Sequence, residues 1–85
     1  MTIKQLQYFV SVCRTENLTA SAKELFISQP TLSLTIKELE EEAGAELFTK
    51  KGNRLFLSDA GRRLQAEAEA VLAQFGRLNE VIASG

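Results

Sequence analysis

The chain has 85 residues, enough for one small domain, and its 45% hydrophobic and 25% charged residues are ordinary for a globular protein. No apolar run is long enough to span a membrane, so we expect no membrane partner. His is absent and Cys13 is the single cysteine, which excludes an internal disulfide and fits a reducing cytoplasm. A zinc site or a nucleophile activated by His is out of reach, so we expect no metal, no cofactor and no enzymatic activity.

The local charge differs from the net charge of −1. Residues 38–46 contain five Glu and no base, whereas Lys50, Lys51 and Arg54 are the only charged residues of segment 47–58. Because salt screens charges beyond about 8 Å, a polyanion responds to local charge. Segment 47–58 is therefore a candidate for contact with phosphates. Its alternative role is solubility, since edge strands often carry Lys.

The first helix is predicted from residue 3 to about Glu16. Apolar side chains recur there at helical spacing, and Thr2 with Gln5 matches the capping-box pattern. Cys13 falls on the apolar stripe, and we expect it to be buried in the core.

A second, short helix is predicted to follow. Either Asn17 or Thr19 caps it, and the sequence does not choose between them. The side chains expected on one side of this helix are Leu18, Ala22, Leu25 and Phe26.

A third helix is predicted to begin after Ser28. Ser28 is a favourable N-cap, and Pro30 lies in the first turn, where its missing N–H costs nothing. The helix should run to about Ala43 and end at Gly44. The second and third helices are then joined by a turn of about three or four residues, which is the spacing of a helix-turn-helix over residues 18–37.

The third helix is predicted to have two distinct faces. At 100° per residue, one face directs apolar side chains to the core. Those side chains are Leu32, Ile36, Leu39 and Ala43. The opposite face carries Pro30, Ser33, Leu34, Lys37 and Glu41. It is either a solvated face or a surface that reads DNA bases with its N-terminal residues, and an exposed Leu34 could then pack on a thymine methyl.

After this helix the sequence pattern changes from helical to strand-like. Residues 47–50 and 54–57 are predicted to be short strands around a turn at Gly52 and Asn53. Ser58 then caps a long helix over residues 59–85. The a/d-type seam of that helix consists of Leu64, Ala68, Val71, Phe75, Leu78 and Ile82, widened by Leu72 and Val81. Because nothing else in the chain is long enough to cover this seam, we expect it to be a dimer interface.

Specific strings in the chain resemble the N-terminal domain of LysR-type bacterial transcriptional regulators. The resemblance covers about residues 3–64 and rests on "SQPTLS", followed by "LE", "LF" and "LSDAG" in the family's order. It implies a winged helix-turn-helix, a linker helix that pairs two subunits, and a separate C-terminal effector domain. It also implies base or backbone contacts by the third helix at Gln29, Pro30, Thr31 and Ser33. Arg54 matches the family's wing arginine, and Lys50 matches a wing position that is usually basic.

The chain departs from the family's pattern at two positions. Leu34 stands where the family commonly has Arg, so a bidentate contact to guanine or phosphate is missing and the preferred site should differ. Ser21 stands where an alanine is common, and we expect little consequence. No effector domain follows, so a small-molecule effector would need a domain absent from this chain.

The expected fold is mainly α: a winged helix-turn-helix of three helices and a β-hairpin over residues 1–58, then a dimerisation or linker helix over 59–85. The expected partners are a second copy of the chain and double-stranded DNA with an interrupted inverted repeat. The candidate DNA-binding residues are Thr19, Ser28, Gln29, Pro30, Thr31, Ser33, Leu34, Lys37, Lys50 and Arg54. The alternative is a helical dimer that engages a protein partner, and salt dependence separates the two.

Overall fold

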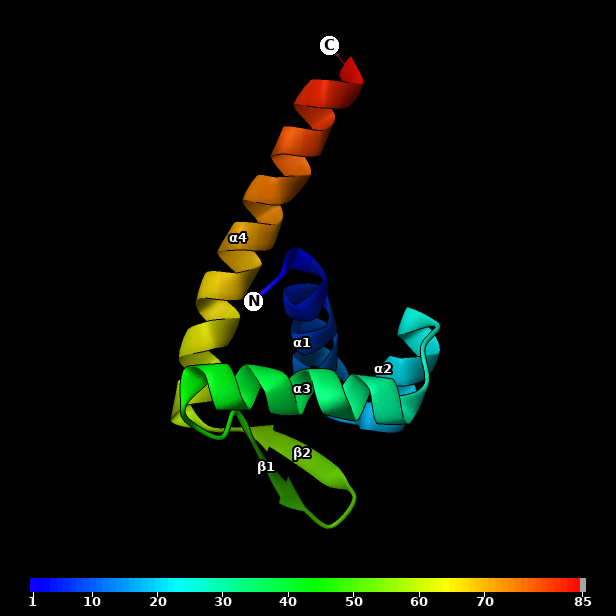
Figure 1. Cartoon of the computed structure of the whole chain (residues 1–85), viewed down its shortest axis with the longest axis vertical. Helices are drawn as coiled ribbons and strands as arrows, with labels where there is room; N and C mark the ends of the chain where they lie inside the picture. The colour runs from blue at the N-terminus through cyan, green and yellow to red at the C-terminus, as the bar shows by residue number, and fades with distance from the viewer. Residues whose placement is uncertain (85) are drawn as a thin grey trace.

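The computed structural model describes residues 1–84 as four helices and one antiparallel hairpin (Figure 1). The elements are α1 (Ile3–Thr15), α2 (Leu18–Leu25), α3 (Gln29–Ala43), β1 (Phe48–Lys51), β2 (Arg54–Leu57) and α4 (Asp59–Ser84). In Figure 1, α3 lies across α1, the hairpin lies below α3, and α4 extends away from the hairpin. The predicted element order and mainly α class are confirmed. None of the helices in residues 1–84 is apolar and long enough to cross a membrane.

Each of the first three helices begins at a side-chain cap. Thr2 and Gln5 form the predicted capping box at α1. Asn17 caps α2, because its backbone is extended and its side chain accepts a hydrogen bond from Ala20 N at 2.8 Å. This settles the choice between Asn17 and Thr19. Ser28 caps α3 as predicted.

The hydrophobic core is centred on α1, whose Phe9 and Val12 are fully buried. Leu32 of α3 and Leu47, just before β1, are also fully buried. Phe9 contacts Phe48 of β1 with ring centroids 5.5 Å apart, so the hairpin shares the helical core. Burial of each such side chain contributes about 1.5–3 kcal/mol.

Cys13 is buried in the same core, as predicted. Burial, together with the negative charge of Glu69, raises the pKa of its thiol to about 12. The thiol therefore stays protonated at neutral pH, and Cys13 serves as a packing residue.

Two apolar residues are more exposed than the sequence pattern predicts. Phe26 is 94% exposed, because the chain leaves α2 there in the left-handed conformation, with φ of 58°. This turn directs the Phe26 side chain away from the face that carries Ala22. Ala43 is exposed because the last turn of α3, before Gly44, extends past the edge of the core.

The predicted seam of α4 is divided between the chain's own core and its surface. Ala68 is only 1% exposed, and Leu64 and Leu72 pack partly buried against the core that α1 builds. The premise that nothing in the chain covers this seam is therefore wrong, because α1 covers its first half. The second half remains at the surface, and its large exposed side chains are Val71, Phe75, Leu78, Val81 and Ile82.

Gly61, in the first turn of α4, lies where that helix approaches the base of the hairpin. A Cβ at this position would collide with the carbonyl oxygen of Leu47 and lie 2.8 Å from Cδ2 of Leu57. Since a backbone atom cannot easily move aside, only glycine allows this approach. The glycine thus fixes the distance between α4 and the hairpin.

We predict that Gly61→Ala destabilises the fold by roughly 1–3 kcal/mol through this overlap. The matched control is Gly76→Ala, because no atom lies within 4 Å of a Cβ built at Gly76. Alanine is the better helix former, so the control should be neutral or stabilising by up to about 1 kcal/mol. Thermal unfolding followed by circular dichroism measures both effects. A melting temperature for Gly61→Ala equal to or above that of the parent would contradict the predicted overlap.

Candidate nucleic-acid interface

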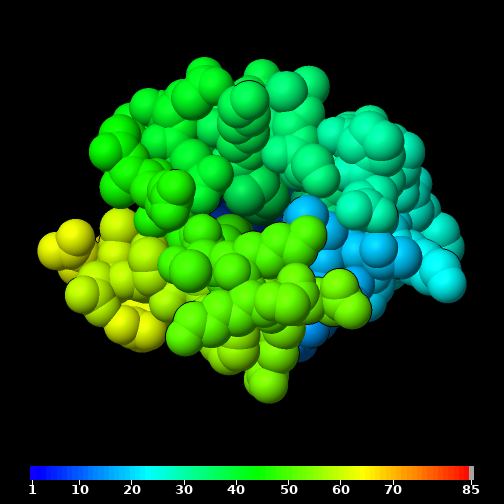
Figure 2. Space-filling model, turned by 90° about the horizontal axis from the view of Figure 1, so that it is seen from below, coloured from blue at the N-terminus to red at the C-terminus, as the bar shows by residue number. Residues whose placement is uncertain are grey.

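A groove runs between α3 and the hairpin on the lower face of the molecule. Figure 2 shows it from below, with α3 on one side and the hairpin on the other. Its two adjoining hollows have volumes of about 350 and 310 Å³ and share Leu18, Lys50 and Leu55 in their walls. The predicted DNA-binding residues that line these hollows are Thr19, Gln29, Ser33, Lys37 and Lys50. The fold therefore brings together half of the candidate set from three separate elements.

The first turn of α3 forms one end of this groove. Ser28 Oγ accepts a hydrogen bond from Thr31 N at 3.2 Å and donates one to Thr31 Oγ1 at 2.8 Å. The Ser28 side chain therefore acts as the cap of the helix. Pro30 and Thr31 are exposed in the first turn, and Leu34 is 58% exposed one turn further on. The predicted exposure of Leu34 is confirmed.

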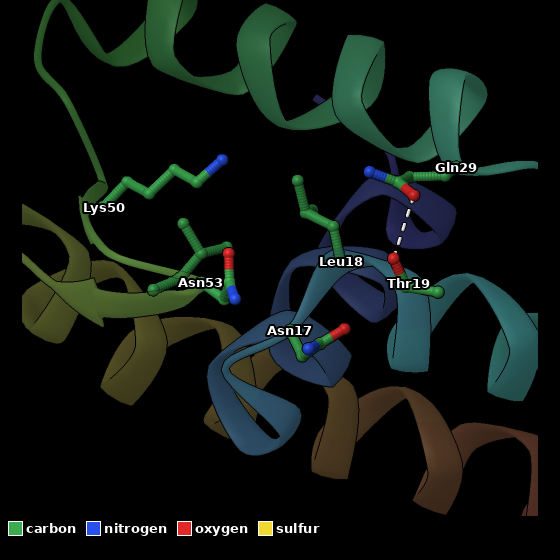
Figure 3. Close-up of a pocket in the computed structure, with 7 residues that line it drawn as sticks. Asn17, Leu18, Thr19, Gln29, Lys50 and Asn53 are labelled. Carbon is green, nitrogen blue, oxygen red and sulfur yellow. Dashed lines mark hydrogen bonds between the residues drawn. The ribbon is translucent and has the colours of Figure 1, made fainter.

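A hydrogen bond joins Thr19, in the first turn of α2, to Gln29, in the first turn of α3. Thr19 Oγ1 donates a hydrogen bond to Gln29 Oε1 at 2.9 Å, as Figure 3 shows. Thr19 has this hydroxyl free because Asn17 is the cap of α2. The bond links the N-terminus of α2 to the N-terminus of α3.

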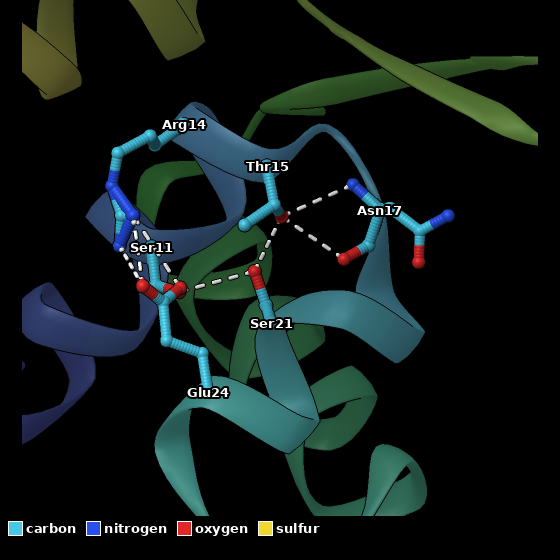
Figure 4. Close-up of polar contacts among 6 residues, drawn as sticks. All are labelled: Ser11, Arg14, Thr15, Asn17, Ser21 and Glu24. Atoms are coloured by element: carbon cyan, nitrogen blue, oxygen red, sulfur yellow. Dashed lines mark hydrogen bonds and ion pairs between the residues drawn. The ribbon is translucent and has the colours of Figure 1, made fainter.

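A polar network holds α2 against α1 (Figure 4). Ser21 is fully buried and its hydroxyl lies 2.6 Å from Thr15 Oγ1 and 3.1 Å from Ser11 Oγ. Ser11 in turn donates to Glu24, which also forms an ion pair with Arg14 at 2.8 Å. The expectation that a serine at position 21 has little consequence is wrong, because its hydroxyl connects this buried network.

Two glutamates attach the hairpin to the helices. Glu40 Oε2 accepts a hydrogen bond from Leu47 N at 2.8 Å, so part of the acidic run of α3 holds the start of β1. The Glu16 carbonyl oxygen accepts from Leu55 N at 3.1 Å and so holds β2. The sequence analysis did not predict either role, because each glutamate and its partner lie in different elements and no helix or strand periodicity relates them.

Arg54 is paired with an acid of the same chain, although its own segment, residues 47–58, contains none. Its Nε and Nη2 lie 3.2 and 2.6 Å from Glu16 Oε1, and its guanidinium lies 5.0 Å from the centre of the Phe56 ring. Glu16 is 38 residues away in sequence and adopts a left-handed φ of 57°, which is uncommon for a residue other than glycine. This conformation carries the Glu16 side chain toward the hairpin.

The described part of the chain offers no metal site. Within residues 1–84, no three His, Cys, Asp or Glu side chains lie together in a way that could hold a metal ion. The polar groups that line the groove are amides, hydroxyls, lysine ammonium groups and the Glu40 carboxylate, and apolar side chains such as Leu18 and Leu55 lie between them. These groups suit contacts to phosphates and base edges.

A helix-turn-helix whose second helix exposes its first turn beside a basic hairpin defines a winged helix-turn-helix DNA-binding domain. Residues 3–62 match the family model described as "Bacterial regulatory helix-turn-helix protein, lysR family". The chain belongs to this family and is a LysR-type DNA-binding domain.

Individual relatives support the assignment. The chain is 33% identical over 84 residues to a "RuBisCO operon transcriptional regulator" of Allochromatium vinosum and 40% identical over 84 residues to a "Probable cat1 operon transcriptional activator" of Acinetobacter lwoffii. Each alignment covers 99% of this chain but only 28% and 27% of the respective relative. The chain therefore spans little more than a quarter of the length of these regulators.

Solved structures show the same fold at full coverage of the chain. The BenM DNA-binding domain in complex with benA site 1 DNA has a TM-score of 0.92 and 28% identity, covering 99% of this chain and 98% of that one. A full-length OxyR variant from Pseudomonas aeruginosa has a TM-score of 0.93 and 32% identity, covering 100% of this chain and 29% of that one. The predicted winged helix-turn-helix with a long C-terminal helix is confirmed.

We predict that Glu16 competes with DNA for Arg54. Glu16→Gln should raise affinity for an unrelated duplex roughly two- to fivefold at low salt, since an exposed pair of this kind is worth about 0.2–1 kcal/mol. Arg54→Ala should then cost more affinity in the Glu16→Gln background than in the parent. Fluorescence anisotropy titrations of the four variants give this comparison.

The control is Glu42→Gln, which removes the same charge from the residue that pairs with the N-terminal amine. It should change affinity less than Glu16→Gln does. If Arg54→Ala costs more in the parent than in the Glu16→Gln background, the carboxylate prepares Arg54 for DNA instead of withholding it.

Proposed function

We propose that the protein binds specific double-stranded DNA sites as a dimer and controls bacterial transcription as the DNA-binding part of a LysR-type regulator. The observation that carries this proposal is the groove, in which the first turn of α3 and the basic hairpin lie on one face. Since such a domain works on the chromosome, we place it in the bacterial cytoplasm. The length of the relatives supports an effector domain in the whole regulator.

In this proposal α3 enters the major groove, which is wide enough to admit a helix. Gln29, Pro30, Thr31 and Ser33 then meet base edges or the adjoining backbone, because recognition helices read bases with their N-terminal residues. Lys37 and Lys50 line the protein's groove between α3 and the hairpin, and their ammonium groups would neutralise DNA phosphates there. The hairpin contributes affinity that depends little on sequence.

Leu34 is proposed to contact a thymine methyl group. Its side chain is 58% exposed in the free protein, so the apolar area becomes buried only on binding. At about 25 cal/mol per Å², burial of much of this side chain contributes on the order of 1 kcal/mol. Substitution at Leu34 should leave the core unchanged, because the core face of α3 carries Leu32 and Ile36 instead.

We predict that replacing one thymine of a selected site by uracil weakens binding of the parent roughly fivefold, because uracil lacks only the methyl group. The Leu34→Ala variant should not distinguish the two bases at that position. Competition binding with a set of singly substituted duplexes measures this. The contact is absent if no thymine shows a parent-specific loss.

The exposed C-terminal half of α4 is proposed to be the dimer interface. Leu78 and Ile82 are 53% and 78% exposed there, and contiguous apolar surface of this kind is seldom left in water. Ala68 is no longer proposed as an interface residue, because it is buried within its own chain. Leu64 and Leu72 can contribute only the part of each side chain that the core leaves exposed. A two-fold dimer would present two recognition helices to an interrupted inverted repeat.

The test is a selection on random duplexes with the parent and with Leu78→Glu/Ile82→Glu. The parent should enrich an interrupted inverted repeat with half-sites about one helical turn apart, or a multiple of it. The variant should be monomeric in sedimentation and lose roughly tenfold or more in affinity for the full repeat, while still favouring a single half-site. Both changes lie on exposed positions, so the fold should persist.

Three results would contradict the proposal in whole or in part. Enrichment of no sequence, or binding that does not weaken as salt rises, would favour a protein-interaction module, because phosphate contacts release counterions. Enrichment of a site without two-fold symmetry would retain DNA binding but reject the dimeric arrangement.

A further inference from the structure

The two faces of the hairpin differ in what they meet. Lys50 pairs with Leu55 across the two strands, and the neighbouring Lys51 pairs with Arg54. Because paired residues share a face and successive residues alternate, the two pairs lie on opposite faces. Lys50 and Leu55 line both hollows of the groove, and within residues 1–84 neither hollow is lined by the other pair. Of the three wing bases, Lys50 is therefore the one inside the groove.

The ammonium group of Lys50 is not engaged by an acid. Lys50 takes part in none of the ion pairs within residues 1–84, whereas Arg54 lies 2.6 Å from Glu16. In Figure 3 the Lys50 side chain extends from the hairpin toward the side of the hollow where Gln29 lies. Its positive charge is thus available to an anion that enters the groove.

Asn53 brings a second hairpin side chain to the groove. Gly52 and Asn53 form the two-residue turn between β1 and β2, and Gly52 has the positive φ, 61°, that a type II′ turn requires at its first position. This turn places Asn53 at the wall of the larger hollow, which Asn17 and Thr19 of α2 also line. Among the residues drawn in Figure 3, the marked hydrogen bond joins Thr19 to Gln29, and Asn53 takes part in none. The Asn53 amide can therefore turn its N–H groups toward a ligand.

The larger hollow, of about 350 Å³, has the chemistry of a phosphate site. Within residues 1–84 its polar lining consists of amides, a hydroxyl and the Lys50 ammonium group, with no carboxylate, whereas the smaller hollow includes Glu40. Lysine and asparagine side chains donate N–H bonds, and phosphate oxygens accept them. Leu18 and Leu55 provide partly buried apolar surface in both hollows, which suits the deoxyribose groups on either side of a phosphate.

We propose that the larger hollow binds one phosphate of the DNA backbone, held by Lys50 and Asn53. This inference rests on the proposed DNA-binding function and assigns Asn53, which the sequence did not single out, to the interface. A phosphate that belongs to a strand fits this site, because the hollow adjoins the smaller one along the groove. Since phosphate contacts fix the register of a protein on the duplex but carry no sequence information, Asn53 positions the domain and does not read a base.

The test is a methylphosphonate scan of a duplex selected from random sequences, in which each backbone phosphate in turn is replaced by an uncharged group. Fluorescence anisotropy gives the affinities of the parent, Lys50→Met, Asn53→Ala and Lys51→Met. At one phosphate of each half-site, removal of the charge should weaken the parent roughly tenfold, because hydrogen bonds to charged groups are strong. At that phosphate Lys50→Met and Asn53→Ala should each lose less than about threefold, since one of its two partners is already gone. Lys51→Met is the matched control and should still lose about tenfold there, because Lys51 lies on the other face of the hairpin.

Asn53→Asp tests the same site with unmodified DNA. It keeps the shape of the side chain, and Asp is accepted in turns, but it places a carboxylate where the phosphate would lie. The matched control is Thr49→Asp, which adds the same charge at an exposed position on the opposite face of the hairpin. Asn53→Asp should bind every duplex roughly tenfold or more weakly than Thr49→Asp, because like charges in contact repel strongly. Thermal unfolding checks that both variants remain folded.

The outcomes that would overturn the inference are distinguishable. If Lys51→Met loses the sensitivity as Lys50→Met does, the hairpin acts through its summed charge and the hollow is not a site. If Asn53→Ala keeps the full loss, or Asn53→Asp binds as tightly as Thr49→Asp, Asn53 does not hold the phosphate. If the parent binds its selected duplex and no single phosphate matters, the phosphate site is absent while the proposed function stands. If the parent enriches no sequence, the proposed function fails, and the inference fails with it.

Discussion

The arrangement of the DNA-facing surface depends on the burial of α1 among the other three helices. Phe9 and Val12 of α1 are fully buried, and α2, α3 and α4 all pack against this one helix. Because an 85-residue chain has a small core, few side chains carry this packing. With α1 at the centre, α3 can bury Leu32 and Leu39 on one side and leave its opposite side in solvent.

The solvent side of α3 is organised by polar contacts that the core does not supply. Asn17 and Ser28 cap the two helices of the helix-turn-helix, which leaves the Thr19 hydroxyl for Gln29. The buried hydroxyl of Ser21 ties α2 to α1. A buried polar network of this kind is stabilising only when every member is satisfied, and no buried side-chain polar atom in residues 1–84 lacks a partner.

Carboxylates place the hairpin, although the hairpin itself is basic. Glu40 binds the backbone at the start of β1, and Glu16 binds both the backbone of β2 and the Arg54 guanidinium. A basic wing held by acids has a defined position before DNA arrives. The same acids also reduce the local positive charge of the hairpin. Its affinity for DNA therefore gains from a fixed position and loses from the lower charge.

The element order, the caps of α1 and α3 and the helix-turn-helix followed from the sequence alone, because those features depend on residues three or four positions apart. The structure was needed to choose Asn17 over Thr19 as the cap of α2. The division of α4, the exposure of Phe26, and the pairings of Thr19 with Gln29 and Glu16 with Arg54 depended on tertiary structure. Those pairs are 10 and 38 residues apart in the chain. No periodic pattern relates such residues, and only the packing of the helices on α1 brings their atoms within hydrogen-bonding distance.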